Sequence, residues 1–174
     1  MKTAKEIATI SVFTALLIGA QFVLSGISGV EIVTVLLLTF CYYFGAVRGV
    51  LVASAFSLLR CFIFGFFPTV IILYLIYYNL FAAVFGLLGL KLKRQSGLKQ
   101  HTILIFAAII MTALFTGLDD IITPLYYGFT RSAAKAYALA SLTALVPQTV
   151  CAIVTVGALF LPLSNIFSRF AEKL

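Results

Sequence analysis

Charged residues are scarce in this chain, and acidic residues are the scarcest. Only 10% of its 174 residues are charged, with five Asp and Glu against twelve Lys and Arg. A soluble domain carries about 25% charged residues, so a water-soluble globule of this length is excluded. The hydrophobic fraction is 63% and the mean hydropathy is +1.19. This composition predicts a protein embedded in the lipid bilayer.

The sequence also lacks the motifs of common chemistries. Its three cysteines form neither a CxxC pair nor a metal-ligand spacing, and they are typical of apolar packing residues. It contains no phosphate-binding GxxxxGK[ST] loop, no HExxH and no GxSxG, and its single histidine, His101, lies in a basic loop. We therefore expect no enzymatic activity, catalytic residue, cofactor or metal. The basic residues form no continuous stripe, which argues against a nucleic-acid partner.

Long apolar segments are what the chain has instead. A helix needs about 20 mostly apolar residues to cross the hydrocarbon core. Six segments approach this length, and the second is short and begins just after Glu31. They cover roughly Ile7–Ser25, Ile32–Val47, Gly49–Phe66, Thr69–Leu90, Thr102–Leu118 and Ala136–Leu161. The sequence predicts an all-α integral membrane bundle of six transmembrane helices that forms one domain over residues 1–174.

The basic residues predict the orientation of this bundle, because cytoplasmic loops are enriched in Lys and Arg. If both termini are cytoplasmic, only Arg131 and Lys135 lie outside and Arg60 lies within the third span. The other nine are then cytoplasmic: Lys2, Lys5, Arg48, Lys91, Lys93, Arg94, Lys99, Arg169 and Lys173. We therefore expect a multi-pass protein of a prokaryotic plasma membrane with both termini inside.

Polar residues inside the spans are candidates for function, since each is costly in a bilayer. They gather toward the predicted outer half and are Glu31, Arg60, Asn79, Asp119, Asp120 and Gln148. Two interpretations stay open. Arg60 could pair with an acid only to neutralise it, or Arg60, Glu31 and the Asp pair could line an outward-facing pocket. Aromatic residues such as Tyr78 would supply the apolar wall of that pocket.

Two further segments have a distinctive composition or spacing. Residues 117–135 are rich in aromatic residues, and we expect them to form a lid over the mouth of the bundle, with an interfacial anchor as the alternative. In the first span, Ser11, Ala15 and Gly19 recur every four residues, and Ala4 and Ala8 form a second pair. Small residues at this spacing let another helix approach closely, either within the bundle or from a partner.

Together these features resemble the substrate-binding membrane subunits, or S components, of energy-coupling factor vitamin transporters. The resemblance covers nearly the whole chain. It is carried by size, topology and four stretches: Lys5-Glu6-Ile7-Ala8 through Thr14-Ala15-Leu16-Leu17, Gly29-Val30-Glu31-Ile32-Val33 through Phe44-Gly45, Phe64-Gly65-Phe66-Phe67-Pro68, and Tyr74 to Asn79.

The resemblance implies a function without catalysis. An S component captures a water-soluble vitamin or precursor outside and docks on a membrane T subunit and two cytoplasmic ABC ATPases. It then topples in the bilayer to release its cargo inside. The family contacts the T subunit through Ala-x-x-x-Ala on its first helix, which Ser11-x-x-x-Ala15 matches with Ser in first place. Its pocket would lie near Asn79, Asp119, Asp120, Tyr126 and Gln148, with Glu31 and Arg60 close by.

The substrate class and two rival functions stay open at this point. Many aromatic residues and several acids favour a flat heterocycle with amino or hydroxyl groups, whereas Arg60 favours a carboxylate or phosphate. A large corrinoid is a further alternative. The rival functions are a small integral membrane enzyme and a membrane assembly protein in which the buried charges form internal salt bridges only.

Overall fold

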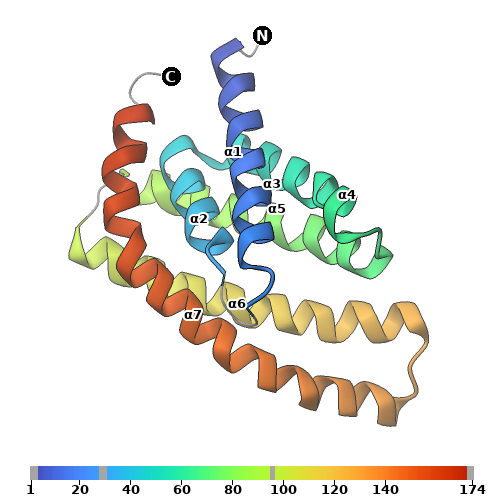
Figure 1. Ribbon diagram of the computed structural model, residues 1–174. Coiled ribbons are helices and arrows are strands. Elements are labelled where there is room, and N and C mark those ends of the chain that lie inside the picture. The colour runs from blue at the N-terminus through green and yellow to red at the C-terminus, as the bar shows by residue number, and fades with distance from the viewer. Residues whose placement is uncertain (1–3, 28–30, 95–96, 172–174) are drawn as a thin grey trace.

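The chain folds as a bundle of helices joined by short turns (Figure 1). The computed structural model describes residues 4–27, 31–94 and 97–171, and over these residues all regular elements are helices. They are α1 (Ala4–Leu24), α2 (Val33–Phe44), α3 (Ala46–Leu59), α4 (Cys61–Phe64), α5 (Pro68–Lys91), α6 (Leu98–Tyr127) and α7 (Arg131–Ala171).

Five helical segments are long and apolar enough to cross a membrane. They are α1, α3 continued through α4, α5, α6 and α7. The prediction of an all-helical chain with several apolar, span-length helices is therefore confirmed. The remaining predicted span, the second along the chain, is α2, which has 12 residues. At 1.5 Å per residue it measures about 18 Å, well short of a hydrocarbon core of about 30 Å.

Helix α2 forms the centre of the bundle. Every one of its twelve residues is buried, and it packs against α1, α3, α5 and α7. A helix that is apolar on all sides has no face to leave in water, so it is buried by its neighbours. Its large side chains include Phe40, which stacks on Phe13 of α1 with ring centroids 4.3 Å apart. Helix α2 is therefore enclosed by its neighbours along its whole length.

Two glycines let α5 lie directly against the turn between α2 and α3. A Cβ atom added to Gly89 would overlap the carbonyl oxygen of Tyr42, and one added to Gly86 would overlap the backbone of Ala46. Small residues at a helix contact let the two backbones approach closely. The two glycines therefore set the distance between α5, which carries the tyrosines, and α2.

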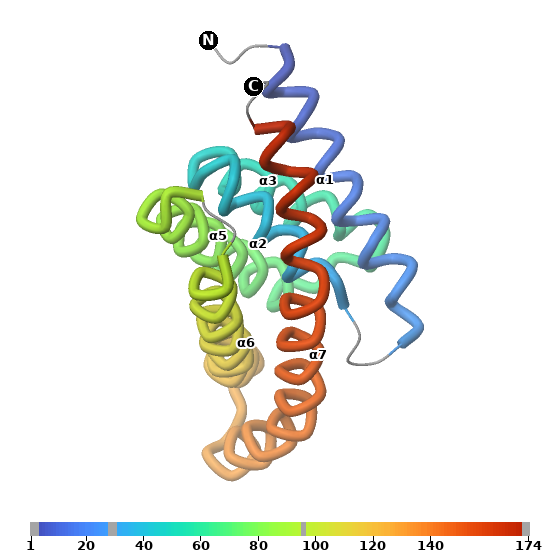
Figure 2. The backbone as a smooth tube through the Cα atoms, turned by 90° about the vertical axis from the view of Figure 1, so that its left-hand side faces the viewer, coloured from blue at the N-terminus to red at the C-terminus, as the bar shows by residue number. Residues whose placement is uncertain are grey.

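The predicted lid over residues 117–135 is wrong. Helix α6 continues through Asp119 and Asp120 to Tyr127, and α7 begins at Arg131, so the two form a long antiparallel hairpin (Figure 1, Figure 2). The last predicted span, Ala136–Leu161, likewise extends to Arg131–Ala171. The Asp pair therefore lies inside a helix, where the helix dipole does not disfavour it as it would at a C-terminus.

Helix α6 ends at a glycine cap, beyond the break that the sequence predicted. Gly128 ends α6 in the left-handed conformation with φ 64°, and Phe129 N–H donates to the carbonyl oxygen of Pro124 (2.9 Å). Glycine adopts this conformation without a steric penalty and commonly ends helices. Gly117 and Pro124, whose residue types predict a break, lie inside α6.

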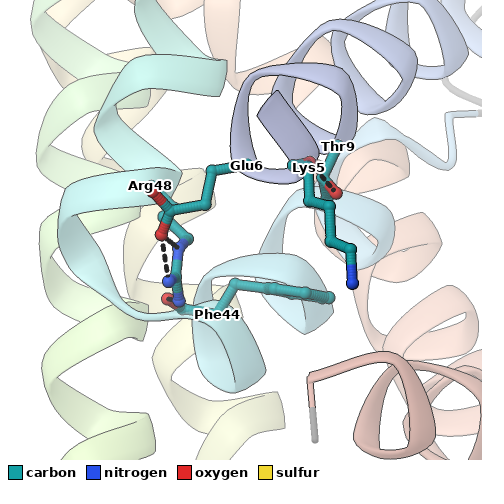
Figure 3. Close-up of polar contacts among 5 residues, drawn as sticks. All are labelled: Lys5, Glu6, Thr9, Phe44 and Arg48. Carbon is teal, nitrogen blue, oxygen red and sulfur yellow. Dashed lines mark hydrogen bonds and ion pairs between the residues drawn. The ribbon is translucent and has the colours of Figure 1, made fainter. Parts of the chain in front are cut away.

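The N-terminal end of α1 and the C-terminal end of α7 lie at the same end of the molecule (Figure 1, Figure 2). At this end Arg48 of α3 forms an ion pair with Glu6 of α1, and its Nε donates to Glu6 Oε1 (3.1 Å) (Figure 3). A second Arg48 nitrogen donates to the carbonyl oxygen of Phe44 (3.4 Å). The predicted cytoplasmic residues Lys2 and Lys173 lie outside the described residues.

Candidate functional site

A cavity of about 200 Å³ lies beside the N-terminal end of α2, between α1, α5, α6 and α7. Three tyrosines and a phenylalanine form an aromatic wall, and the remaining lining is largely polar with one carboxylate. The lining residues are Gln21, Glu31, Val33, Thr34, Tyr74, Tyr77, Tyr78, Thr112, Phe115 and Gln148. An apolar wall with a few convergent polar groups is the usual composition of a small-molecule site.

The aromatic wall follows from the spacing of the tyrosines in α5. Residues three and four apart share one face of a helix, so Tyr77 and Tyr78 lie on either side of Tyr74 on one broad face of α5. The rings of Tyr74 and Tyr78 lie 4.9 Å apart between centroids. Tyr77 meets Phe115 of α6 edge-on, also at 4.9 Å. These contacts fix the wall, which presents aromatic surface to the cavity.

Glu31 supplies the carboxylate of the cavity. Its Oε2 accepts a hydrogen bond from the Thr34 N–H (2.9 Å), so the charge lies at the N-terminal end of α2. The positive end of the helix dipole and the free N–H groups stabilise an anion there. The Glu31 backbone is also tied to α7, because its N–H donates to Cys151 Sγ and the thiol donates to its carbonyl oxygen (both 3.3 Å).

Arg60 lies behind the cavity, at the junction of α3 and α4. Only 8% of its surface is exposed. Its guanidinium carbon lies 4.1 Å from the ring centroid of Tyr74 and 4.9 Å from that of Phe64, and its Nε donates to Gln21 Oε1 (3.0 Å). In the described part of the chain, no carboxylate pairs with Arg60. Aromatic faces and an amide oxygen therefore compensate this buried cation in place of an acid.

Three of the predicted site residues line the cavity: Glu31, Tyr78 and Gln148. Asn79 does not, because it follows Tyr78 on α5 and points toward α3. Its Oδ1 accepts a hydrogen bond from the Ser54 hydroxyl (2.9 Å), and its Nδ2 donates to the Leu75 carbonyl oxygen (2.8 Å). One of its polar atoms thus joins α3 to α5, and the other bonds within α5.

Asp119 and Asp120 join the two arms of the hairpin and are absent from the cavity lining. Asp119 accepts hydrogen bonds from the hydroxyls of Thr123 (2.6 Å) and Tyr137 (2.7 Å), and Asp120 accepts one from Ser141 (3.0 Å). Tyr126 is exposed at the end of α6. The structure therefore does not bring these three residues to the cavity that contains Glu31.

Gln21 is one of the lining residues that the sequence did not predict. It is a polar residue within the first apolar span, so the rule that selected Asn79 and Gln148 also applies to it. It lies next to the small-residue stripe, a pattern that indicates packing. Tyr74 and Tyr77 belong to an aromatic run that is evident in the sequence, but spacing alone does not show which face of α5 borders a cavity.

The small-residue stripe of α1 lies on the outside of the bundle. Ser11, Ala15 and Gly19 are all exposed, as are Ala4 and Ala8. A Cβ atom added to Gly19 would meet no atom within 4 Å. The stripe is therefore not used for packing between the described helices of this chain, which leaves a partner helix as the other interpretation.

Next to this stripe, α1 borders an apolar groove of about 470 Å³. Helices α2 and α7 complete it, and Figure 3 shows three of its residues, Lys5, Thr9 and Phe44. The full lining is Lys5, Ala8, Thr9, Val12, Phe13, Phe40, Phe44, Phe167 and Phe170. The outer face of α1 thus combines small residues with a neighbouring aromatic depression.

The cysteines and the histidine have structural contacts. Cys41 and Cys61 are buried, and no group of three His, Cys, Asp or Glu residues suited to a metal occurs over residues 4–27, 31–94 and 97–171. His101 Nε2 lies 3.0 Å from the Val156 carbonyl oxygen, and its ring stacks on Phe160. His101 therefore connects α6 to α7.

No family model, curated protein or solved structure matches this chain. The geometry of the cavity and of α1 is therefore the basis on which a function can be proposed.

Proposed function

We propose that this chain is a membrane-embedded substrate-binding subunit of an energy-coupling factor importer. It binds a small, water-soluble aromatic molecule of the vitamin or vitamin-precursor type in the cavity beside Glu31. The observation that carries the proposal is a cavity with an aromatic wall and a carboxylate inside a bundle of apolar helices. A charged group in such a setting is costly, and it marks a functional site by default.

The exposed face of α1 supports the second half of the proposal, which is a partner in the membrane. The sequence contains no phosphate-binding loop, so energy for uptake has to come from other subunits. We propose that Ser11, Ala15 and the neighbouring small residues contact a T subunit, which in turn couples to two ABC ATPases. In this arrangement both termini lie in the cytoplasm, and the ligand enters from the opposite side of the plasma membrane.

Co-purification tests this function. The chain is expressed with the T subunit and the two ATPases of the same organism, and a stable four-protein complex is expected. Ser11→Phe or Ala15→Phe fills the stripe, so recovery of the complex should fall by about tenfold or more, which corresponds to about 1.4 kcal/mol.

Ala158→Phe is the matched control, because Ala158 is exposed on α7, away from the stripe. It should leave complex recovery unchanged. Failure of the wild-type chain to assemble would reject the importer function and favour a membrane enzyme or an assembly protein. Equal recovery for the Ala15→Phe variant and its control would remove the stripe from the interface.

A further inference from the structure

Arg60 determines the direction of the hydrogen bonds on one side of the cavity. An arginine Nε–H can only donate, so the Gln21 atom 3.0 Å from it has to be the amide oxygen. The Gln21 amide nitrogen is then the atom that faces Tyr74, and it donates to the tyrosine oxygen at 3.4 Å. The orientation of this amide, which is often ambiguous, is fixed here by its neighbour.

The hydrogen bonds keep the same donor-to-acceptor direction from Tyr74 toward the cavity. Because the Tyr74 oxygen accepts from Gln21, its own O–H is left to donate. Gln21 has a second amide N–H as well, and both residues line the cavity. The cation above the Tyr74 ring adds positive potential at this side. This side of the cavity therefore presents hydrogen-bond donors.

The Glu31 side has the opposite character. An ionised carboxylate only accepts hydrogen bonds, and the Thr34 N–H uses part of its capacity. In the described part of the chain, no cation pairs with this carboxylate. A donor group on a ligand would supply the missing interaction. The cavity is thus an acceptor at Glu31 and a donor at Gln21 and Tyr74, with aromatic rings between.

We propose that the ligand of this cavity is a flat amphoteric aromatic molecule. One edge carries an amine or ring N–H, which donates to Glu31. Another edge carries a carbonyl or carboxylate oxygen, which accepts from Gln21 and Tyr74. Arg60 is a positioning residue that orients Gln21 and does not contact the ligand. The inference rests on the proposed function in so far as it takes the cavity as the ligand site.

Three small probes test the polarity of the cavity. 4-Aminobenzoate has both a donor and an acceptor, benzoate lacks the amine, and aniline lacks the carboxylate. Affinities are measured by saturation-transfer NMR on the purified full chain, with empty micelles as the blank. We expect 4-aminobenzoate to bind about tenfold or more tightly than either single-ended probe, since each end contributes a hydrogen bond to or from a charged group. Equal affinities, or no binding of 4-aminobenzoate, would overturn the inference.

Two variants test which residue binds the amine end of the probe and which binds the carboxylate end. In Glu31→Gln the amide oxygen can still accept from Thr34, so the fold is kept while the charge is lost. This variant should lose the preference for 4-aminobenzoate over benzoate. In Gln21→Glu the side chain still accepts from Arg60 but has no N–H for Tyr74. This variant should lose the preference for 4-aminobenzoate over aniline.

Asp120→Asn and Asn79→Asp are the matched controls, because they make the same chemical exchanges away from the cavity lining. Both should keep the wild-type order of affinities, and a change in the controls as large as that in the cavity variants would overturn the assignment. The outcome is separable from the importer function. A complex that assembles without this selectivity rejects the inference alone, whereas selectivity without a coupling complex rejects the importer function alone.

Discussion

Arg60 is a buried cation that forms no salt bridge within the described part of the chain. The guanidinium lies against two aromatic rings and donates to an amide oxygen. Its planar shape suits stacking, and its fixed donors suit a single amide oxygen. A lysine has neither property and is more strongly hydrated. This position is therefore expected to require arginine, even though no carboxylate in the described part of the chain pairs with it.

Two substitutions separate this arrangement from an ion pair. Arg60→Lys should lower the free energy of unfolding by about 1–3 kcal/mol, because it loses the Gln21 bond and buries a poorly compensated ammonium. Arg60→Met should cost less, because no charge is then buried. The chain has no tryptophan, so heat-induced labelling of the buried Cys41 and Cys61 by a thiol-reactive dye is a suitable measure.

An ion pair at Arg60 predicts the opposite order. Removing the cation of a buried pair strands its carboxylate and costs about 3–5 kcal/mol. A larger loss for Arg60→Met than for Arg60→Lys would therefore mean that an acid, and not the aromatic rings and Gln21, compensates the guanidinium.

The sequence predicted which residue types form a site better than it predicted which side chains face the cavity. Glu31 and Gln148 were expected at a site because polar groups in an apolar span need a reason, and both line the cavity. Asp119 and Asn79 satisfied the same rule but form hydrogen bonds within the fold. Depth in a span does not say which way a side chain points. That direction depends on helix rotation, which packing determines.

At the scale of elements, the contact of α5 with the core depends on Gly86 and Gly89. The tyrosine wall lies on the same helix, so the separation of α5 from α2 positions one side of the cavity. Packed interiors do not accommodate an extra methyl group against backbone without a shift.

Gly89→Ala should destabilise the fold by about 1–3 kcal/mol, because the new Cβ would overlap the Tyr42 carbonyl oxygen. Gly117→Ala is the control, since a Cβ there meets no atom within 4 Å. It should be neutral or stabilise by up to about 1 kcal/mol through helix propensity. Thermal labelling of the buried cysteines measures both variants. Equal stability of the two would show that α5 does not approach the α2–α3 turn this closely.

The helices were predicted well where apolar runs are long and poorly where polar residues interrupt them. The sequence placed α1, α3 continued through α4, and α5 within a few residues of their observed bounds. It ended the α6 helix too early because Asp119 and Asp120 looked like a boundary. In the fold Asp119 accepts a hydrogen bond from Tyr137 and Asp120 accepts one from Ser141, and both donors lie on α7, far along the chain. A long-range partner of this kind leaves no local signal in the sequence.

At the scale of the whole molecule, the scarcity of charge and the arrangement of helices both produce an apolar outer surface. The outer surface is rich in large apolar side chains, among them Val23, Leu98 and Leu125. A bilayer solvates such a surface, whereas water does not. Polar side chains line the cavity beside Glu31, and others join the two arms of the α6–α7 hairpin.

The most direct test of a ligand-binding subunit is native mass spectrometry of the full chain, released from detergent micelles. We predict that the wild-type protein retains a small molecule with an aromatic ring, a nitrogen donor and an oxygen acceptor. Asp120→Asn should retain the same molecule, and Glu31→Gln should lose most of it. A wild-type protein without bound molecule, or one whose ligand survives Glu31→Gln unchanged, would contradict a ligand site at Glu31.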